Sequence, residues 1–278
     1  MHLRIKAFTK TPCKIPYNYQ YVLHSAIYSL IQKSSKEYSE FLHHKGFELN
    51  ERSANDESKN IKKIFKLFTF SKLKFFPNNR TKYGFENVKE IEFNFATPVK
   101  KSFEHLVLGI FSNSEIILNF QNRNAKFNIQ SVETIKEPSI SGEEKFICLS
   151  PICTSTVRIK NGKREQHFLN YMDPKERSKF IQNIKSNLIK KYKTIYEKDY
   201  RNGNLDFQFS FDPEYIVKKE GKISKLISFK NNIKIKAYEA PFTIKADPEL
   251  IKIGYDCGFG ENNSAGFGMV KVNLPQRR

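Results

Sequence analysis

The chain has 278 residues, of which 39% are apolar, and its 48 Lys+Arg against 29 Asp+Glu give a formal net charge of +19. The 25 Phe and 13 Tyr can build packed cores, which excludes a largely disordered chain, and the length fits one large domain or two ordinary ones. The basic excess predicts a polyanionic partner, with nucleic acid favoured over a membrane or a heparin-like polymer.

The opening segment and the cysteines indicate a cytoplasmic protein with reduced thiols. The segment MHLRIKAFTKTPCKIPYNY has no apolar h-region, and no stretch approaches the ~20 apolar residues of a transmembrane helix. None of the four cysteines, Cys13, Cys148, Cys153 and Cys257, has C-x-x-C spacing. We therefore expect no signal peptide, no membrane span, no disulfide framework and no structural zinc. Because no dense Asp/Glu cluster suggests a two-metal site either, we expect no cofactor.

The first elements in chain order are a strand and two helices. Residues 2–8 alternate in sidedness and predict an opening strand, and residues 18–33 have the apolar spacing of an amphipathic helix. A second short helix over 36–44 runs into Gly46, which is a typical C-terminal stop. The polar residues 48–60 predict a loop.

Four further segments complete the first unit. Residues 66–74 and 91–96 predict strands, 101–111 a helix, and 115–120 a strand that 127–134 extends. The resulting order is β-α-β-β-α-β, which is the ferredoxin-like unit that RNA-recognition domains also use. The turn-rich segment EPSISG then predicts a boundary between a domain over 1–138 and a domain over 143–278.

The second half repeats this order in weaker form. Its expected elements are a long strand at 145–159, a helix at 174–198, strands at 205–211 and 223–244 with a turn at Asn231-Asn232, a short helix at 247–253, and a last strand at 267–272. We therefore predict an α+β fold of two tandem ferredoxin-like domains, the second of them degraded.

A glycine cluster lies close to the C-terminal end of the sequence. The segment DCGFGENNSAGFGMVKV contains four of the chain's 12 glycines, namely Gly258, Gly260, Gly266 and Gly268. Such loops let a backbone approach a phosphate, but dinucleotide and P-loop versions lead directly into a helix. Here a short strand pattern follows, which excludes a mononucleotide cofactor site.

The same segment resembles the glycine-rich signature of the CRISPR repeat-cleaving endoribonucleases, the Cas6 family of repeat-associated RNA-binding proteins. The resemblance extends in order along the chain to PYNYQYVLHSAIYSLI, FLHHKGF, KLFTFS and LSPICTSTVR. It implies two ferredoxin-like domains with the glycine-rich loop near the cleft between them. It also implies metal-independent cleavage of precursor CRISPR RNA within each repeat, in which the ribose 2′-OH attacks and leaves a 2′,3′-cyclic phosphate and a 5′-OH. Candidate partners are CRISPR repeat RNA, a second copy of the chain, and a CRISPR effector complex.

Carried over position by position, the resemblance implies His43, Tyr28 and Lys66 as catalytic residues. His44 is the alternative to His43, because helical neighbours point about 100° apart and only one should face the cleft. Tyr28 is equally compatible with a packed helix tyrosine, and Lys66 with a solvent-facing lysine among other lysines. His24 is the weaker candidate, a surface or wall residue of the cleft.

The predicted RNA contacts are Gly258, Gly260, Asn262, Asn263, Ser264, Gly266, Gly268, Arg158 and Lys160. The alternative reading of the glycine loop is a tight structural turn before an interior strand. Lys191 and the lysines near it on the long predicted helix are equally compatible with a solvated face.

Two other functions stay open on the sequence. A catalytically inactive relative would bind CRISPR RNA as a structural subunit of an effector complex, and His43 in its matching context speaks against it. A general RNA-binding protein would usually carry an aromatic-rich motif on a strand, and the sequence has none. The endoribonuclease is therefore favoured.

Overall fold

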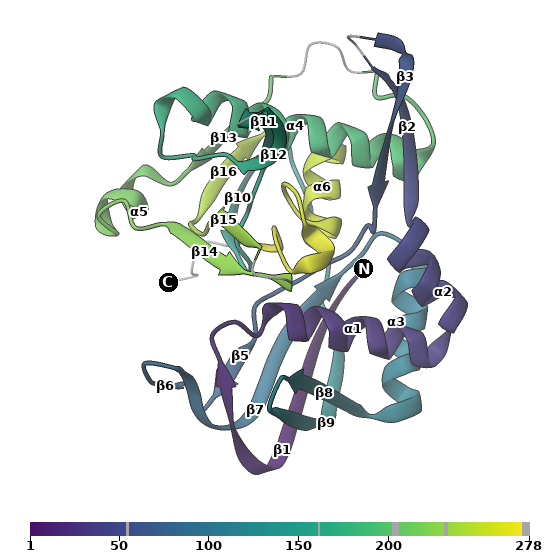
Figure 1. Cartoon of the computed structure of the whole chain (residues 1–278), viewed down its shortest axis with the longest axis vertical. Helices are drawn as coiled ribbons and strands as arrows, with labels where there is room; N and C mark the ends of the chain where they lie inside the picture. Colours follow the sequence, from purple (N-terminus) through teal and green to yellow (C-terminus); the bar gives the residue numbers. More distant parts are fainter. Residues whose placement is uncertain (54–55, 161, 202–205, 231–232, 274–278) are drawn as a thin grey trace.

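The computed structural model describes residues 1–53, 56–160, 162–201, 206–230 and 233–273. Two lobes stack on each other in Figure 1, the lower one formed by the first half of the chain and the upper one by the second half, except that residues 47–53 and 56–65 of the first half rise beside the upper lobe. None of the described helices is long and apolar enough to cross a membrane.

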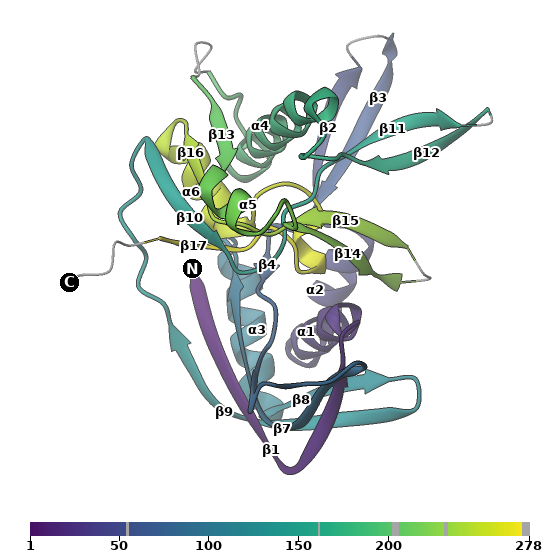
Figure 2. The same cartoon turned by 90° about the vertical axis from the view of Figure 1, so that its left-hand side faces the viewer.

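The N-terminal lobe is an antiparallel sheet with its helices on one face. The strand order is β4 (Thr69–Phe70), β7 (Gly84–Ala96), β1 (His2–Pro16), β9 (Arg123–Thr134) and β8 (Glu115–Phe120), with β5 (Lys74–Phe76) and β6 (Asn79–Arg80) also paired to β7. Helices α1 (Gln20–Ser34) and α3 (Lys100–Asn113) contribute Leu23, Ile27 and Leu106 to one core with sheet residues such as Ile5 and Phe93. Figure 2 shows both helices on the same side of the sheet.

The C-terminal lobe repeats this topology with shorter strands. Its order is β13 (Gln208–Phe211), β16 (Phe242–Lys245), β10 (Glu143–Cys148) and β17 (Val270–Val272). Helices α4 (Pro174–Tyr196) and α6 (Pro248–Cys257) supply the two crossovers, and α5 (Pro213–Lys218) is an extra turn. The C-terminal sheet has the order second, third, first, fourth strand. The N-terminal sheet has the same order, with β4 and β7 beside β1 on one side and β9 in the fourth place, and β8 is added outside β9. This is the ferredoxin-like order, so the predicted fold class is confirmed.

Three hairpins lie outside the two sheets. They are β2 (Phe47–Ser53) with β3 (Asp56–Phe65), β11 (Ser155–Lys160) with β12 (Lys163–Phe168), and β14 (Ser224–Ser228) with β15 (Lys234–Tyr238). In Figure 2 the last two project from the same side of the molecule. The turn predicted at Asn231-Asn232 lies outside the described residues.

Two of these hairpins correct the sequence prediction. The loop expected over 48–60 is wrong, because β2 and β3 pair through this segment in antiparallel register. Residues 50–53 and 56–60 of these strands are all polar, so this part of the hairpin lacks the apolar alternation that identifies a strand. The single strand expected over 145–159 is also wrong, because β10 ends at Cys148 and β11 pairs instead with β12. Pro151 separates them, and proline cannot donate to a ladder.

The two lobes are in contact through buried residues and are not joined only by a linker. Phe65 and Leu67, which precede β4, belong to the buried core of the C-terminal lobe. Thr69 on β4 donates a hydrogen bond through Oγ1 to the carbonyl of Phe267, at 2.9 Å. The cleft between the lobes is therefore held by buried contacts on its floor. The boundaries at 138 and 143 stay a prediction.

Candidate active site

A cavity of about 420 Å³ opens between α1, the end of the next helical segment, and the β14–β15 hairpin. Its wall includes His24 and Tyr28 from α1, His43 and His44 from the segment after α2 (Lys36–Glu40), and Phe229 at the end of β14. Two of the three predicted catalytic residues thus line one cavity, together with a histidine that the sequence ranked lower.

A widened helical turn presents the two neighbouring histidines. Phe41–Lys45 forms the π-helical turn η1, in which the N–H of Gly46 donates to the carbonyl of Phe41 at 2.6 Å. The side chains of His43 and His44 are both exposed, both line the cavity, and their ring centroids are 4.7 Å apart. The expectation that only one of them faces the cleft is therefore wrong. It assumed the angular spacing of an α-helix, whereas a π turn spreads five residues over a wider loop.

Tyr28 lies between His24 and His43. Its ring centroid is 4.7 Å from that of His24 and 6.0 Å from that of His43, which it meets edge to face. Burial raises the pKa of Tyr28 well above its usual range. The Ser264 side chain lowers this pKa, but by less than burial raises it. Tyr28 is therefore a neutral phenol at working pH, suited to donating a hydrogen bond rather than accepting a proton.

The ring of His24 is oriented by the backbone of Ser264. Its Nδ1 lies 2.7 Å from the Ser264 carbonyl oxygen. Because a carbonyl only accepts, Nδ1 carries the hydrogen, and in the neutral ring Nε2 keeps the lone pair. Burial lowers the pKa of His24, the charges of His43 and Lys230 lower it further, and the Ser264 contact opposes them. The i,i+4 spacing of His24 and Tyr28 was the sequence signal for this pair.

Lys66 comes to the site from the segment between β3 and β4. Its Nζ donates to the backbone carbonyl of His43 at 3.1 Å, and burial lowers its pKa. Gly46 leaves room for this lysine, because a Cβ at Gly46 would stand 3.1 Å from Lys66 Cδ. Three separate elements thus bring Tyr28, His43 and Lys66 into one neighbourhood.

The glycine-rich loop is packed into the protein. Gly258, Gly260, Gly266 and Gly268 are all buried and have φ between +71° and +90°. A Cβ on Gly260 would lie 2.4 Å from the Cys153 carbonyl oxygen. The close approaches that these glycines permit are thus made to the protein's own atoms, and their contact with RNA stays a prediction.

The far side of this loop faces α1. The side-chain amide of Gln20 donates to the carbonyls of Ala265, at 3.0 Å, and Gly266, at 2.6 Å. Of the other loop residues predicted to contact RNA, Asn262 is exposed, whereas Asn263 and Ser264 are half-buried. The loop therefore forms part of the cleft floor beside the cavity.

Gly268→Ala is expected to lower the free energy of unfolding by about 2–5 kcal/mol, since it adds left-handed backbone strain to a severe clash. The new Cβ would lie 2.0 Å from the carbonyl oxygen of Phe259. Gly162→Ala is the matched control, because Gly162 has a similar φ of +72° with no atom within 4 Å of its Cβ position. It should cost only about 1–2 kcal/mol. Denaturant unfolding measures both, and equal losses would contradict the clash.

Arg158 and Lys160 lie on the β11–β12 hairpin rather than in the cavity wall. Both side chains are exposed, and Arg158 forms an ion pair with Glu176 on α4. The neighbouring Val157 and Ile159 are 65% and 78% exposed, which leaves one face of the hairpin apolar. The structure thus places these two residues on a projecting arm.

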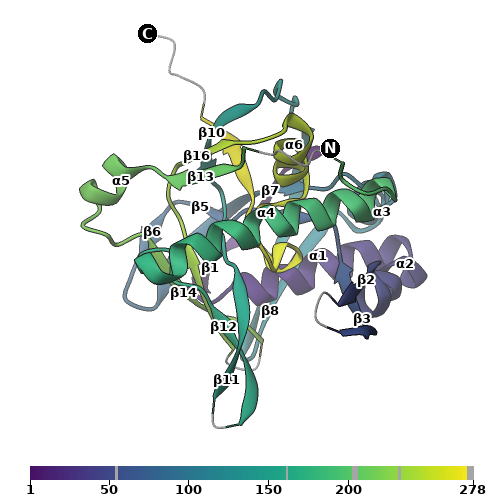
Figure 3. The same cartoon turned by 90° about the horizontal axis from the view of Figure 1, so that it is seen from above.

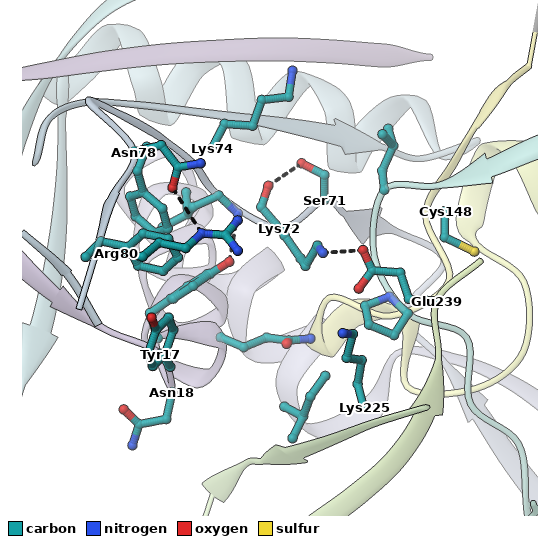
Figure 4. A pocket seen from close by; sticks show the side chains of 18 of the residues that line it. Tyr17, Asn18, Ser71, Lys72, Lys74, Asn78, Arg80, Cys148, Lys225 and Glu239 are labelled. Carbon is teal, nitrogen blue, oxygen red and sulfur yellow. Dashed lines mark hydrogen bonds and ion pairs between the residues drawn. The ribbon is translucent and has the colours of Figure 1, made fainter. Parts of the chain in front are cut away.

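A larger groove of about 850 Å³ adjoins the cavity, and the sequence did not identify it. Lys72, Lys74, Arg80 and Lys225 contribute cationic side chains to it, and Tyr17 stands half-exposed among them (Figure 4). Lys72 is paired with Glu239 across the groove. Gln20 and Ser228 line the groove, and their chain neighbours Tyr21 and Phe229 line the cavity, so the two hollows lie next to each other. Among the described residues, no cluster of His, Cys, Asp and Glu could hold a metal ion.

Comparison with known proteins identifies close counterparts along the whole chain. Residues 14–133 match the family model of the CRISPR-associated protein Cas6 N-terminal region, and residues 135–272 match that of the Cas6 C-terminal region. The chain is 31% identical over 279 residues to CRISPR-associated endoribonuclease Cas6 1 of Methanocaldococcus jannaschii, covering 100% of this chain and 94% of the relative. It is 30% identical over 264 residues to CRISPR-associated endoribonuclease Cas6 of Pyrococcus furiosus, covering 93% and 84%.

Solved structures agree with this similarity. A structure described as CRISPR associated protein Cas6 superposes with a TM-score of 0.74 at 28% identity, over 99% of each chain. Another, described as a RAMP protein binding different RNA substrates, has a TM-score of 0.72 at 19% identity over 99% of this chain and 100% of that one, which shows the shared fold.

Proposed function

The chain belongs to the Cas6 family of CRISPR-associated endoribonucleases, and from this premise we propose that it cleaves precursor CRISPR RNA within each repeat without a metal ion. Membership of this family implies that the protein is an RNA endonuclease of CRISPR RNA processing. The observation that supports metal-free cleavage within the repeat is the convergence of three imidazoles, those of His24, His43 and His44, with the phenol of Tyr28 in one cavity, where the Lys66 ammonium bonds to the backbone of His43.

The proposed reaction is an internal transesterification. The 2′-oxygen of the ribose loses its proton to a base and forms a bond to the adjacent phosphorus. The bond from phosphorus to the 5′-oxygen breaks, and an acid delivers a proton to that oxygen. The products are a 2′,3′-cyclic phosphate and a 5′-OH, so no water and no metal-bound nucleophile enters the step.

Each role suits the chemistry of the residue that we assign to it. His43 is the proton-transfer group, either as the base at the 2′-oxygen or as the acid at the 5′-oxygen. Its exposed ring in the cavity can reach a bound phosphodiester. Tyr28 donates a hydrogen bond to a phosphoryl oxygen through its neutral phenol. Lys66 supplies positive charge to the transition state, where partial burial strengthens its field. His24, with an oriented ring and a lone pair on Nε2, is the other imidazole to test.

The RNA is proposed to approach along the groove of Figure 4. Its cations neutralise phosphates and its aromatic rim stacks on bases, which is how proteins hold single-stranded RNA. The strand then crosses the β14–β15 hairpin to the cavity. Asn262 and Ser264 of the glycine-rich loop and Arg158 and Lys160 of the projecting arm are proposed as further contacts.

The test is cleavage of end-labelled repeat RNA in excess EDTA. We expect cleavage at one position, at an unchanged rate, to a product whose 3′ end is a 2′,3′-cyclic phosphate. A matched RNA with a single 2′-deoxyribose on the 5′ side of that phosphate should bind equally and remain uncut, because the nucleophile is missing. A rate that falls in EDTA and recovers with Mg²⁺ would contradict the metal-free step. Binding without cleavage would leave an RNA-binding subunit.

A further inference from the structure

One lysine of the long helix α4 is buried on the inner face of that helix. Lys191 is only 2% exposed and shares its face with Ile184, Leu188 and Tyr192, which belong to the C-terminal core. An ammonium group in such surroundings is costly unless acceptors replace its hydration. Lys191 therefore needs polar partners within the protein.

The glycine-rich loop, residues 258–268, supplies these partners. The Nζ of Lys191 donates to the carbonyls of Gly258, at 2.6 Å, and Gly260, at 3.3 Å, and to the side-chain oxygen of Asn263, at 2.7 Å. An ammonium has three N–H donors, and three acceptors receive them. Figure 3 shows the turn η3 (Asn263–Ala265) beneath α4.

Asn263, which accepts from Lys191, also bonds to the two ends of the loop, at Phe259 and Phe267. Its side-chain amide nitrogen donates to the carbonyl of Phe259, at 3.2 Å, and to that of Phe267, at 3.0 Å. The N–H of Phe259 also donates to the carbonyl of Gly268, at 2.9 Å. The two ends of the loop are thus joined by hydrogen bonds around the Asn263 side chain, which accepts a hydrogen bond from Lys191.

The residue after Asn263 reaches the catalytic cavity. The Ser264 carbonyl accepts the hydrogen bond that orients the His24 ring, and the Tyr28 ring packs beside His24, with the ring centroids 4.7 Å apart. We propose that Lys191 is a positioning residue, whose ammonium holds the glycine-rich loop in the shape that fixes His24 and Tyr28 in the cavity. The effect on cleavage rests on the function proposed above, whereas the effect on loop structure does not.

The charges around Lys191 are compatible with this role. Burial lowers the pKa of Lys191, Lys63 on β3 also lowers it, and Cys257, Glu261 and Cys153 raise it, with a net pKa of about 8. The two thiols have pKa values raised by burial to about 11 and about 12, so they are neutral near pH 7. At that pH Lys191 is mostly protonated and can donate to all three acceptors.

The experiment compares Lys191→Met with Lys179→Met. Lys179 is exposed on the same helix, so both variants lose one positive charge. Hydrogen exchange should become faster in Lys191→Met over residues 258–268 and also over 20–28, and Lys179→Met should match the wild type. The single-turnover cleavage rate at saturating protein should fall by about 10- to 100-fold relative to Lys179→Met, the usual effect of a misplaced catalytic group. Kd should rise by less than this, because Asn262 and Ser264 are only two of the proposed RNA contacts.

Two results would overturn the proposal. One is unchanged exchange over 20–28, and the other is a folded Lys191→Met protein that cleaves as fast as Lys179→Met. If the wild type binds repeat RNA but does not cleave it, the proposed function fails while the exchange data still decide the role of Lys191. If Lys191→Met does not fold, Asn263→Ala replaces it, since it keeps the lysine and two of its acceptors. Unchanged exchange in that variant equally overturns the proposal.

Discussion

His43→Ala is expected to slow single-turnover cleavage of repeat RNA by about 10²–10⁴-fold, the usual contribution of a positioned acid or base. Its ring is exposed in the cavity and meets Tyr28 edge to face, so its loss removes a proton-transfer group without opening a core. RNA affinity should stay unchanged, because the groove cations are untouched. Cleavage time courses with RNA in trace amounts against saturating protein measure the rate, and filter binding measures Kd.

The controls separate the histidines from one another. His105→Ala removes a ring on α3 that contacts Ser34 at 2.9 Å, outside the cavity, and should cleave like the wild type. His44→Ala and His24→Ala complete the series. A loss in His44→Ala that exceeds the loss in His43→Ala would move the role to His44. A loss confined to His24→Ala would assign the proton transfer to the buried imidazole.

Lys66→Met is expected to lower the cleavage rate by about 10²–10³-fold, as removal of one charge-stabilising donor from a preorganised site usually does. The Lys66 ammonium lies 3.1 Å from the His43 carbonyl and the side chain is half-buried, so solvent screens its charge less than that of a fully exposed lysine. Methionine keeps much of the volume of the stem and loses the ammonium. Single-turnover rates with trace RNA and saturating protein are the measurement.

The matched control for Lys66 is Lys100→Met. Lys100 is exposed at the start of α3 beside Glu104, and its loss changes the net charge by the same amount. Equal rates in the two variants would contradict a catalytic role for Lys66. A Lys66→Met protein whose Kd rises while its saturated cleavage rate stays unchanged would show that the ammonium binds the RNA in the ground state as strongly as in the transition state.

Much of the fold could be predicted from the sequence because its signals are local. The helix α1, the strand β7 and the helix α4 each carry apolar spacing over a dozen or more residues, and their order gives the ferredoxin-like topology twice. The exceptions were segments without such spacing. The outer part of the β2–β3 hairpin, residues 50–53 and 56–60, is entirely polar, and the strand at Ser155 changes partner after Pro151, which only the pairing reveals.

The sequence by itself determined the order of the elements, the family motifs, and the residue types that the chemistry needs. The tertiary structure decided which of them meet. The π turn places His43 and His44 in one cavity, and the Lys66 ammonium bonds to the carbonyl of His43. Lys191 is buried against the glycine-rich loop, which lies more than sixty residues further along the chain. The reason is that contacts between lobes depend on helix rotation, turn geometry and desolvation. None of these is encoded in the spacing of neighbouring residues.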